Sequence, residues 1–186
     1  MSKNKIVIFI SHSSKNIDFV KLLTDTLVYA GIPKENIFCS SMPECDIPLG
    51  ENIVDIIKKK IKTCACFICV HSKEYYTSPI CLNEMGACWI LSIKHYSIML
   101  PNIRFDDMKG VIGSNDILIS LNMRENELKD KMIQLVKDLH TIVKSTNCDE
   151  VLIEKAVNKF LCEYERLRQN NELPLAEICD KSILFN

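Results

Sequence analysis

Residues 78–89, SPICLNEMGACW, bring together side chains that are suited to chemistry. The segment holds one carboxylate, Glu84, two thiols, Cys81 and Cys88, and the only tryptophan of the chain, Trp89. A carboxylate in a protected position can stabilise a developing positive charge or attack an electrophilic carbon. A lone glutamate on a helix is also often no more than a solvated side chain, and spacing alone does not separate these two interpretations.

A helix that begins near Ser78 or Pro79 must position this carboxylate, because proline is well tolerated in the first turn of a helix. We expect Ser78, Met85 and two cysteines, Cys81 and Cys88, to face the core. That arrangement predicts that Glu84 lies at the exposed rim of the helix, where its removal would cost little stability.

A second cluster of residues could in principle bind zinc, because thiolate and imidazole are preferred ligands of that metal. Its members are Cys64, Cys66, Cys69 and His71. In a buried strand over residues 65–70 the side chains alternate, so the first two cysteines face one side and the other two residues face the opposite side. Paired Cys-x-x-Cys motifs are also absent. We therefore predict no metal and no bound cofactor, and interpret the ten cysteines as mostly buried thiols of a reducing compartment.

Composition limits the class of protein. The 186 residues fit one domain with a small appendage, and 47% hydrophobic with 25% charged residues is typical of a globular chain. The net charge of −1 predicts neither nucleic acid nor membrane as a partner, and the lysines at 58–60 and 62 indicate a solvated helix end. No apolar stretch reaches the roughly 20 residues of a membrane span, so we expect a cytoplasmic protein.

Strand and helix signals alternate along the chain. Apolar runs predict strands at residues 5–10, near 35–41, at 65–70, 96–100 and 116–121. Helical spacing predicts helices over residues 17–30, closed by Gly31, and over 51–62. This order predicts an α/β fold with a parallel sheet covered by helices on both faces. Ligands then gather at the carboxyl ends of the strands, where residues 11–14, the loop 40–50 and residues 71–84 should meet.

Two further helices are expected after residue 122, the second capped by Asp149. We divide the chain into a domain over residues 1–145 and a helical extension over 146–186 that packs on it. The chain has no G-x-G-x-x-G, Walker or G-x-S-x-G motif, which argues against an ordinary dinucleotide oxidoreductase, a nucleoside triphosphatase and a serine hydrolase.

Three ordered segments resemble the Toll/interleukin-1 receptor (TIR) domain of the bacterial kind. Residues 9–12, FISH, resemble its first box, residues 42–52 its BB loop with Asp46-Ile47-Pro48 and Gly50, and Ser78, Cys81 and Glu84 its serine-x-x-cysteine-x-x-glutamate segment. The resemblance covers about residues 5–121. It implies a flavodoxin-like, three-layer fold with a five-stranded parallel sheet, in which Glu84 is the catalytic residue of enzymatic members.

Enzymatic TIR domains cleave the bond between nicotinamide and ribose in NAD, which is a substrate and not a cofactor. Nicotinamide leaves as a neutral molecule, so no general acid is needed, and a carboxylate beside the oxocarbenium-like ribose suffices. Glu84 could supply that charge or form a covalent intermediate. The residues that the resemblance places at the substrate are Phe9, Ser11, His12, Ser13, Ser41, Asp46, Ile47, Gly50, Ser78 and Trp89.

Several of these assignments have alternatives. Ser11, His12 and Ser13 could hold phosphate or adenosine hydroxyls, or simply cap a helix. His12 could be a neutral hydrogen-bonding residue or a catalytic base, and Trp89 could stack on a ring or lie in the core. Ser41 and the loop from Asp46 to Gly50 could cover the substrate or contact a neighbouring subunit.

The chain also resembles stand-alone TIR proteins of Thoeris-type antiphage systems, which make a cyclic or conjugated ADP-ribose signal for a second protein. It implies TIR–TIR self-association and a separate effector or sensor as partners. A non-catalytic TIR scaffold and a nucleoside deoxyribosyltransferase-like enzyme are the alternative functions.

Overall fold

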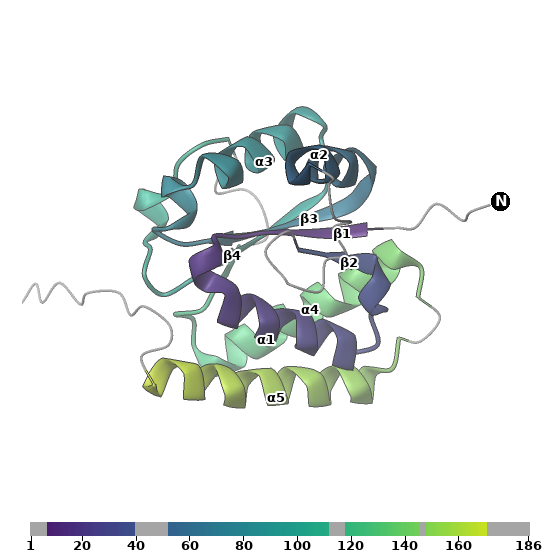
Figure 1. Cartoon of the computed structure of the whole chain (residues 1–186). Coiled ribbons are helices and arrows are strands. Elements are labelled where there is room, and N and C mark those ends of the chain that lie inside the picture. The colour runs from purple at the N-terminus through teal and green to yellow at the C-terminus, as the bar shows by residue number, and fades with distance from the viewer. Residues whose placement is uncertain (1–6, 40–51, 112–117, 146–147, 171–186) are drawn as a thin grey trace, which may run out of the picture.

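A five-stranded parallel sheet forms the centre of the computed structural model, which describes residues 7–39, 52–111, 118–145 and 148–170 (Figure 1). Neighbouring strands follow the order β2-β1-β3-β4-β5, and every pair is parallel. This confirms the predicted α/β fold. The strands are β1 (Val7–Ser11), β2 (Ile37–Phe38), β3 (Cys64–His71), β4 (His95–Met99) and β5 (Leu118–Ser120).

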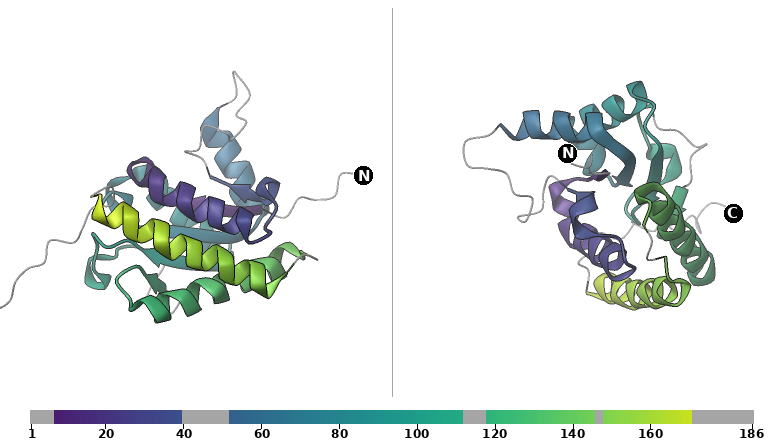
Figure 2. Two further views of the ribbon diagram at one scale, coloured as in Figure 1. Left: turned by 90° about the horizontal axis from the view of Figure 1, so that it is seen from below. Right: turned by 90° about the vertical axis from the view of Figure 1, so that its right-hand side faces the viewer.

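Helices cover both faces of the sheet, and a further helix adds an outer layer (Figure 1). Helices α2 (Ile53–Thr63) and α3 (Pro79–Ile90) cover one face, while α1 (Ile17–Tyr29) and α4 (Glu125–Val143) cover the other. Helix α5 (Glu150–Gln169) lies across α1 and α4, as the two turned views show (Figure 2). In the described part of the chain, no helix is long and apolar enough to cross a membrane.

Side-chain alternation divides the apolar core in two. In β1, Ile8 and Ile10 pack on the α1–α4 side, while Val7 and Phe9 pack on the α2–α3 side. A central strand buried on both faces therefore reads as a continuous apolar run. Cys64 does not follow the expected alternation, because the pairing with β1 shifts by one residue between Val7 and Ile8.

That shift corrects the predicted arrangement of the cysteines in β3. Cys64 packs in the same apolar cluster as Cys69, on the α2–α3 side, whereas Cys66 faces α1 and α4. His71 is buried and its two ring nitrogens bond Ser97 and Tyr76. Within the described ranges, no three His, Cys, Asp or Glu side chains are arranged to hold a metal ion.

The helix ends follow the signals in the sequence. Gly31 adopts a φ of 93°, a left-handed conformation that favours glycine, directly after α1. The side chain of Asp149 accepts from the backbone N–H groups of Val151 and Leu152, which confirms the predicted cap of α5. Ser78 caps α3, with Pro79 in the first turn.

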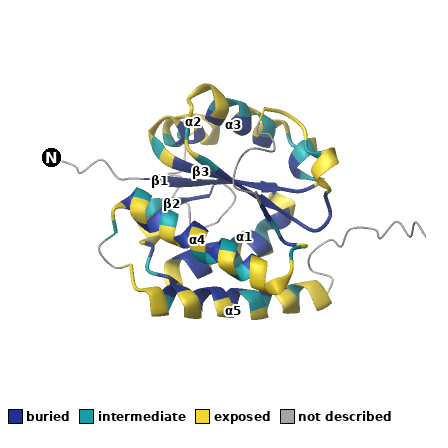
Figure 3. Cartoon of the chain, turned by 180° about the vertical axis from the view of Figure 1, so that it is seen from behind, coloured by how far each residue is buried: buried dark blue, intermediate teal, exposed yellow. Residues whose placement is uncertain are grey.

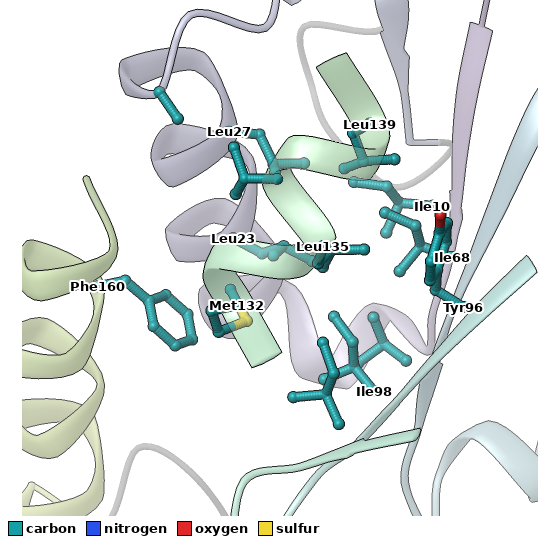
Figure 4. Packing of buried hydrophobic residues seen from close by; sticks show 14 of the residues in the cluster. Ile10, Leu23, Leu27, Ile68, Tyr96, Ile98, Met132, Leu135, Leu139 and Phe160 are labelled. Atoms are coloured by element: carbon teal, nitrogen blue, oxygen red, sulfur yellow. The ribbon is translucent and has the colours of Figure 1, made fainter. Parts of the chain in front are cut away.

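Helix α5 contributes to the main core through one apolar side. Phe160 is fully buried, and its ring lies at 6.2 Å, edge-on, from the ring of Phe19 in α1. The close view shows Phe160 beside Met132 of α4 (Figure 4). The outer side of α5 is largely exposed (Figure 3). The helix is thus an amphipathic cover whose apolar side completes the core under α1 and α4.

We expect Phe160→Ala to lower the free energy of unfolding by about 3–5 kcal/mol, because it deletes a buried ring and leaves a cavity between three helices. Urea unfolding followed by circular dichroism measures this loss. Asn158→Ala, at an exposed position of the same helix, is the control and should change stability little. A loss below about 1 kcal/mol for Phe160→Ala would mean that α5 is not part of the cooperative unit.

Candidate active site

The candidate site lies where β1 ends and α3 begins. In a sheet of this order the strand connections reverse direction between β1 and β3, and ligands bind outside the carboxyl ends of the strands at that point. Ser11 is the last residue of β1. The segment that follows β3 leads through a short turn at Tyr75–Thr77 into α3. Both segments supply polar side chains to one buried cluster.

Ser78, the N-cap of α3, and two residues of the helix, Cys81 and Glu84, are spaced by three, and the last two fix the helix to the end of β1. The Oγ of Ser78 accepts from the N–H of Cys81 at 3.4 Å. The thiol of Cys81 donates to the carbonyl of His12 at 3.3 Å, and the hydroxyl of Ser11 donates to Oε2 of Glu84 at 2.5 Å. Residues three apart are neighbours on a helix surface. The serine-x-x-cysteine-x-x-glutamate spacing therefore caps the helix, anchors it and delivers the carboxylate.

Glu84 is buried, with only 4% of its surface exposed, so the predicted rim position is wrong. Cys81, Met85 and Cys88 are buried on the same helix. Positions 81, 84, 85 and 88 form the stripe of a helix that faces a core, so the spacing itself places Glu84 inward. The predicted core stripe of Ser78, Cys81, Met85 and Cys88 left out position 84, although this position lies next to Cys81 and Cys88 on the same side of the helix.

Burial has a large electrostatic effect on this carboxyl group. Desolvation raises the pKa of Glu84 from 4.5 to about 7, and the hydrogen bond from Ser11 opposes that rise. A carboxylate out of water is costly unless hydrogen bonds or a positive charge compensate it. Among the described residues, the second oxygen, Oε1, is buried and has no hydrogen-bond partner. This oxygen is therefore the atom that a bound ligand could satisfy.

A hydroxyl group behind Ser11 allows the cluster to serve both protonation states of Glu84. The Oη of Tyr75 lies 3.1 Å from the Oγ of Ser11 and 3.2 Å from the carbonyl oxygen of Cys81. When Glu84 is ionised, Ser11 donates to it and can accept from Tyr75. When Glu84 is protonated, Ser11 can accept from the acid and donate to Tyr75, which then donates to the carbonyl of Cys81.

Sequence reasoning missed Tyr75. Its side chain is fully buried, and nothing in the spacing of residues 72–77 distinguishes it from the neighbouring Tyr76. Its position directly after β3, at the strand end where the site was expected, is the signal that could have found it.

His12 and Ser13 have other partners than Glu84. The ring of His12 is buried with Nδ1 at 3.5 Å from the thiol sulfur of Cys39, and desolvation lowers its pKa to about 4. The imidazole is thus neutral at pH 7, and its low pKa makes it a weak base, which favours a hydrogen-bonding role. The Oγ of Ser13 accepts from the backbone N–H of Lys15, as a cap of the short helix that precedes α1.

Two aromatic residues of the predicted site lie elsewhere. Phe9 is fully buried, and its ring stacks on that of Phe67 at 5.0 Å, so we leave it out of the proposed site. Trp89 is 57% exposed, and the alternative that it belongs to the core is wrong. It is five positions from Glu84, about 140° around the helix. Four predicted residues, Ser41, Asp46, Ile47 and Gly50, lie outside the described residues.

A groove between α2 and α3 has Glu84 in its lining. The cavity measures about 430 Å³, within the range of sites for small ligands. Its walls are mainly apolar and include Ile57 and Ile61 of α2 with Ile80 and Ala87 of α3. The site therefore combines a buried carboxyl group of raised pKa with an apolar space next to it.

The fold and the site together define an α/β domain with a buried carboxyl group at the strand ends. A family model described as TIR domain matches residues 8–136, so the chain belongs to the TIR domain family. The uncharacterized protein YddK of Bacillus subtilis (strain 168) is 35% identical over 130 residues, which are 69% of this chain and 48% of that protein. The chain thus spans about half the length of this curated relative.

The fold was also compared with solved structures. The TIR domains of the activated Roq1 resistosome, which directly recognizes the pathogen effector XopQ, align with 90% of this chain over 98% of their own length. The TM-score is 0.39 and the sequence identity is 15%. Membership of the family is established by the family model, which matches residues 8–136.

Proposed function

We propose that this protein is an enzyme that cleaves NAD at the bond between nicotinamide and ribose, with Glu84 as the catalytic residue. The observation that carries the proposal is the buried Glu84 carboxyl, which Ser11 holds by one oxygen while the other has no partner among the described residues. An exposed structural glutamate would have neither feature. The reaction requires no cofactor, because NAD is the substrate.

The geometry suits a reaction in which positive charge moves from a pyridinium ring to the ribose. Nicotinamide leaves as a neutral group, so the enzyme needs no acid at the leaving group. A carboxylate in a poorly solvated site stabilises the oxocarbenium-like ribose strongly, because little water screens it. Ser11 holds Oε2, which leaves Oε1 to face the ribose carbon or its hydroxyl groups.

Substrate binding would also set the charge of Glu84. At pH 7 the free carboxyl group is near the midpoint of its titration, since its pKa is about 7. A cationic nicotinamide ring beside it favours the ionised form and lowers the pKa. The site would therefore acquire its catalytic charge as the substrate enters.

The finer parts of the function are also proposals. We infer that the product is ADP-ribose or a cyclic or conjugated form of it, made as a signal in bacterial antiphage immunity of the Thoeris type. A separate effector or sensor protein and self-association of TIR domains complete this proposal. Their support is the membership of the TIR family.

A non-catalytic TIR scaffold is the second candidate function. Trp89, Ile90 and Leu91 are consecutive and exposed at the end of α3, with Ile90 at 73%. Consecutive exposed apolar side chains are more typical of interaction surfaces than of a free helix end. A scaffold would use this surface and would not turn over NAD.

Incubation of concentrated protein with NAD, followed by chromatography with mass detection, tests the proposal. We expect release of nicotinamide, and the mass of the second product distinguishes hydrolysis from cyclisation. Deoxynucleosides are supplied in a parallel reaction. If only deoxynucleosides are consumed, the enzyme is of the deoxyribosyltransferase type. If neither substrate is consumed, including under crowding that promotes assembly, the scaffold function replaces the enzyme.

A further inference from the structure

The groove between α2 and α3 carries charges of both signs at separate places. In its lining the charged side chains are Glu84 on α3 and two lysines, Lys58 and Lys62, on α2. The lysines are four positions apart and thus lie on one side of their helix. An apolar surface from Ile57 and Ile61 completes the α2 wall. A ligand that fits this groove has a cationic part, an apolar part and an anionic part.

The two lysines are available for a ligand. Lys58 forms an ion pair with Asp55 at 3.4 Å, but the two side chains are 65% and 60% exposed, and such surface pairs contribute little. Lys62 has no ion-pair partner within the described ranges. The neighbouring Lys60 is directed elsewhere, since its Nζ lies 5.2 Å from the ring centre of Phe38.

We infer that Lys58 and Lys62 bind the phosphate groups of a dinucleotide whose cationic ring lies against Glu84. This inference rests on the proposed function and names the part of the protein that selects the substrate. Lysine is a compact cation that attracts phosphate without a fixed geometry, which suits a flexible pyrophosphate at an exposed rim. The apolar wall between the two charges accommodates the rings and sugar edges that connect them.

The substrate should therefore lose affinity when the lysines are removed, while the chemical step remains. We expect the double variant Lys58→Gln/Lys62→Gln to raise the KM for NAD about tenfold or more, with kcat changed less than about twofold, because ground-state and transition-state binding weaken equally. The matched control is Lys59→Gln/Lys155→Gln, which removes the same charge at exposed positions outside the groove. Its KM should stay within about twofold of the wild type.

Binding is measured separately from turnover. Titration calorimetry with NAD on Glu84→Gln protein, with and without the two lysine substitutions, gives the dissociation constant without a reaction. A matching loss of affinity in the lysine variant supports the inference. If the control variant loses as much affinity for NAD as the Lys58 and Lys62 variant does, these lysines act only through non-specific electrostatic attraction, and the inference is overturned.

The two proposals fail in different ways. If the wild type cleaves NAD and the lysine variant has an unchanged KM, the phosphate site is wrong and the proposed function stands. If NAD binds in a lysine-dependent manner but is not cleaved, the phosphate site stands and the proposed function is wrong. If NAD neither binds nor reacts, both are wrong.

Discussion

Glu84→Gln is expected to lower the rate of NAD cleavage by at least about 100-fold, because it removes the negative charge that stabilises the ribose in the transition state. Glutamine keeps the size of the side chain, and its carbonyl can still accept the hydrogen bond from Ser11. The measurement is nicotinamide release under single-turnover conditions, with enzyme in excess over NAD. This arrangement separates the chemical step from product release.

A matched control tests whether loss of activity comes from the charge at position 84 or from the loss of any negative charge. Glu165 is an exposed glutamate of α5 that pairs with Arg168, and Glu165→Gln should retain the wild-type rate. A Glu84→Gln protein with full activity would exclude this residue as the catalytic group. The catalytic group would then have to be sought among other residues, including those outside the described ranges.

The Glu84→Gln substitution is also expected to stabilise the folded protein, and this gain in the free energy of unfolding should grow as the pH rises. The pKa of Glu84 is raised from 4.5 to about 7 in the folded state. Between these values the folded state binds more protons than the unfolded state, so wild-type stability falls as the pH rises through this interval. Glutamine has no such titration. At pH 8 the variant should be more stable by up to about 3 kcal/mol, and at pH 4 the two proteins should be nearly equal.

Urea unfolding of both proteins at several pH values between 4 and 8 measures this difference. The other titrating groups are common to the two proteins and cancel in the comparison. The Ser11→Ala variant provides a second test of the raised pKa of Glu84. Because the Ser11 hydroxyl opposes the rise of the Glu84 pKa, its loss should destabilise the protein more at pH 8 than at pH 4. A difference between wild type and Glu84→Gln that does not vary with pH would show that Glu84 titrates normally.

Much of the fold follows from local pattern. A buried parallel strand must be apolar on both faces, so the runs at residues 5–10 and 65–70 predicted β1 and β3 without reference to their neighbours. Gly31 and Asp149 marked helix ends because each satisfies a conformational or hydrogen-bonding requirement that few residue types meet. Sequence could not predict the shift between Val7 and Ile8, which arises from the pairing of two strands distant in the chain.

For the candidate site, the sequence pattern predicted which residues matter but not their burial or their contacts. The resemblance selected Glu84 and its two companions, Ser78 and Cys81, by their spacing. The burial of Glu84 and its partner could not be obtained in the same way, since Ser11 is 73 residues distant and the contact depends on how α3 lies on the sheet. The contact between Tyr75 and Ser11 could not be predicted for the same reason, because these two residues are also distant in the chain. Tyr75 acts through Ser11, and a residue of that kind leaves no motif beside the carboxylate that it supports.

The outer helix determines which parts of the molecule an approaching protein can meet. Because α5 lies across α1 and α4, a partner arriving from that side finds a surface of alternating charges, with ion pairs such as Arg166 to Glu163 and Arg168 to Glu165. The buried apolar residues of α1 and α4, such as Leu23 and Leu135, pack in the core and are not part of that surface. The two sides of the molecule therefore differ in chemistry: α5 presents mainly charged side chains on one, and the end of α3 exposes Trp89, Ile90 and Leu91 on the other.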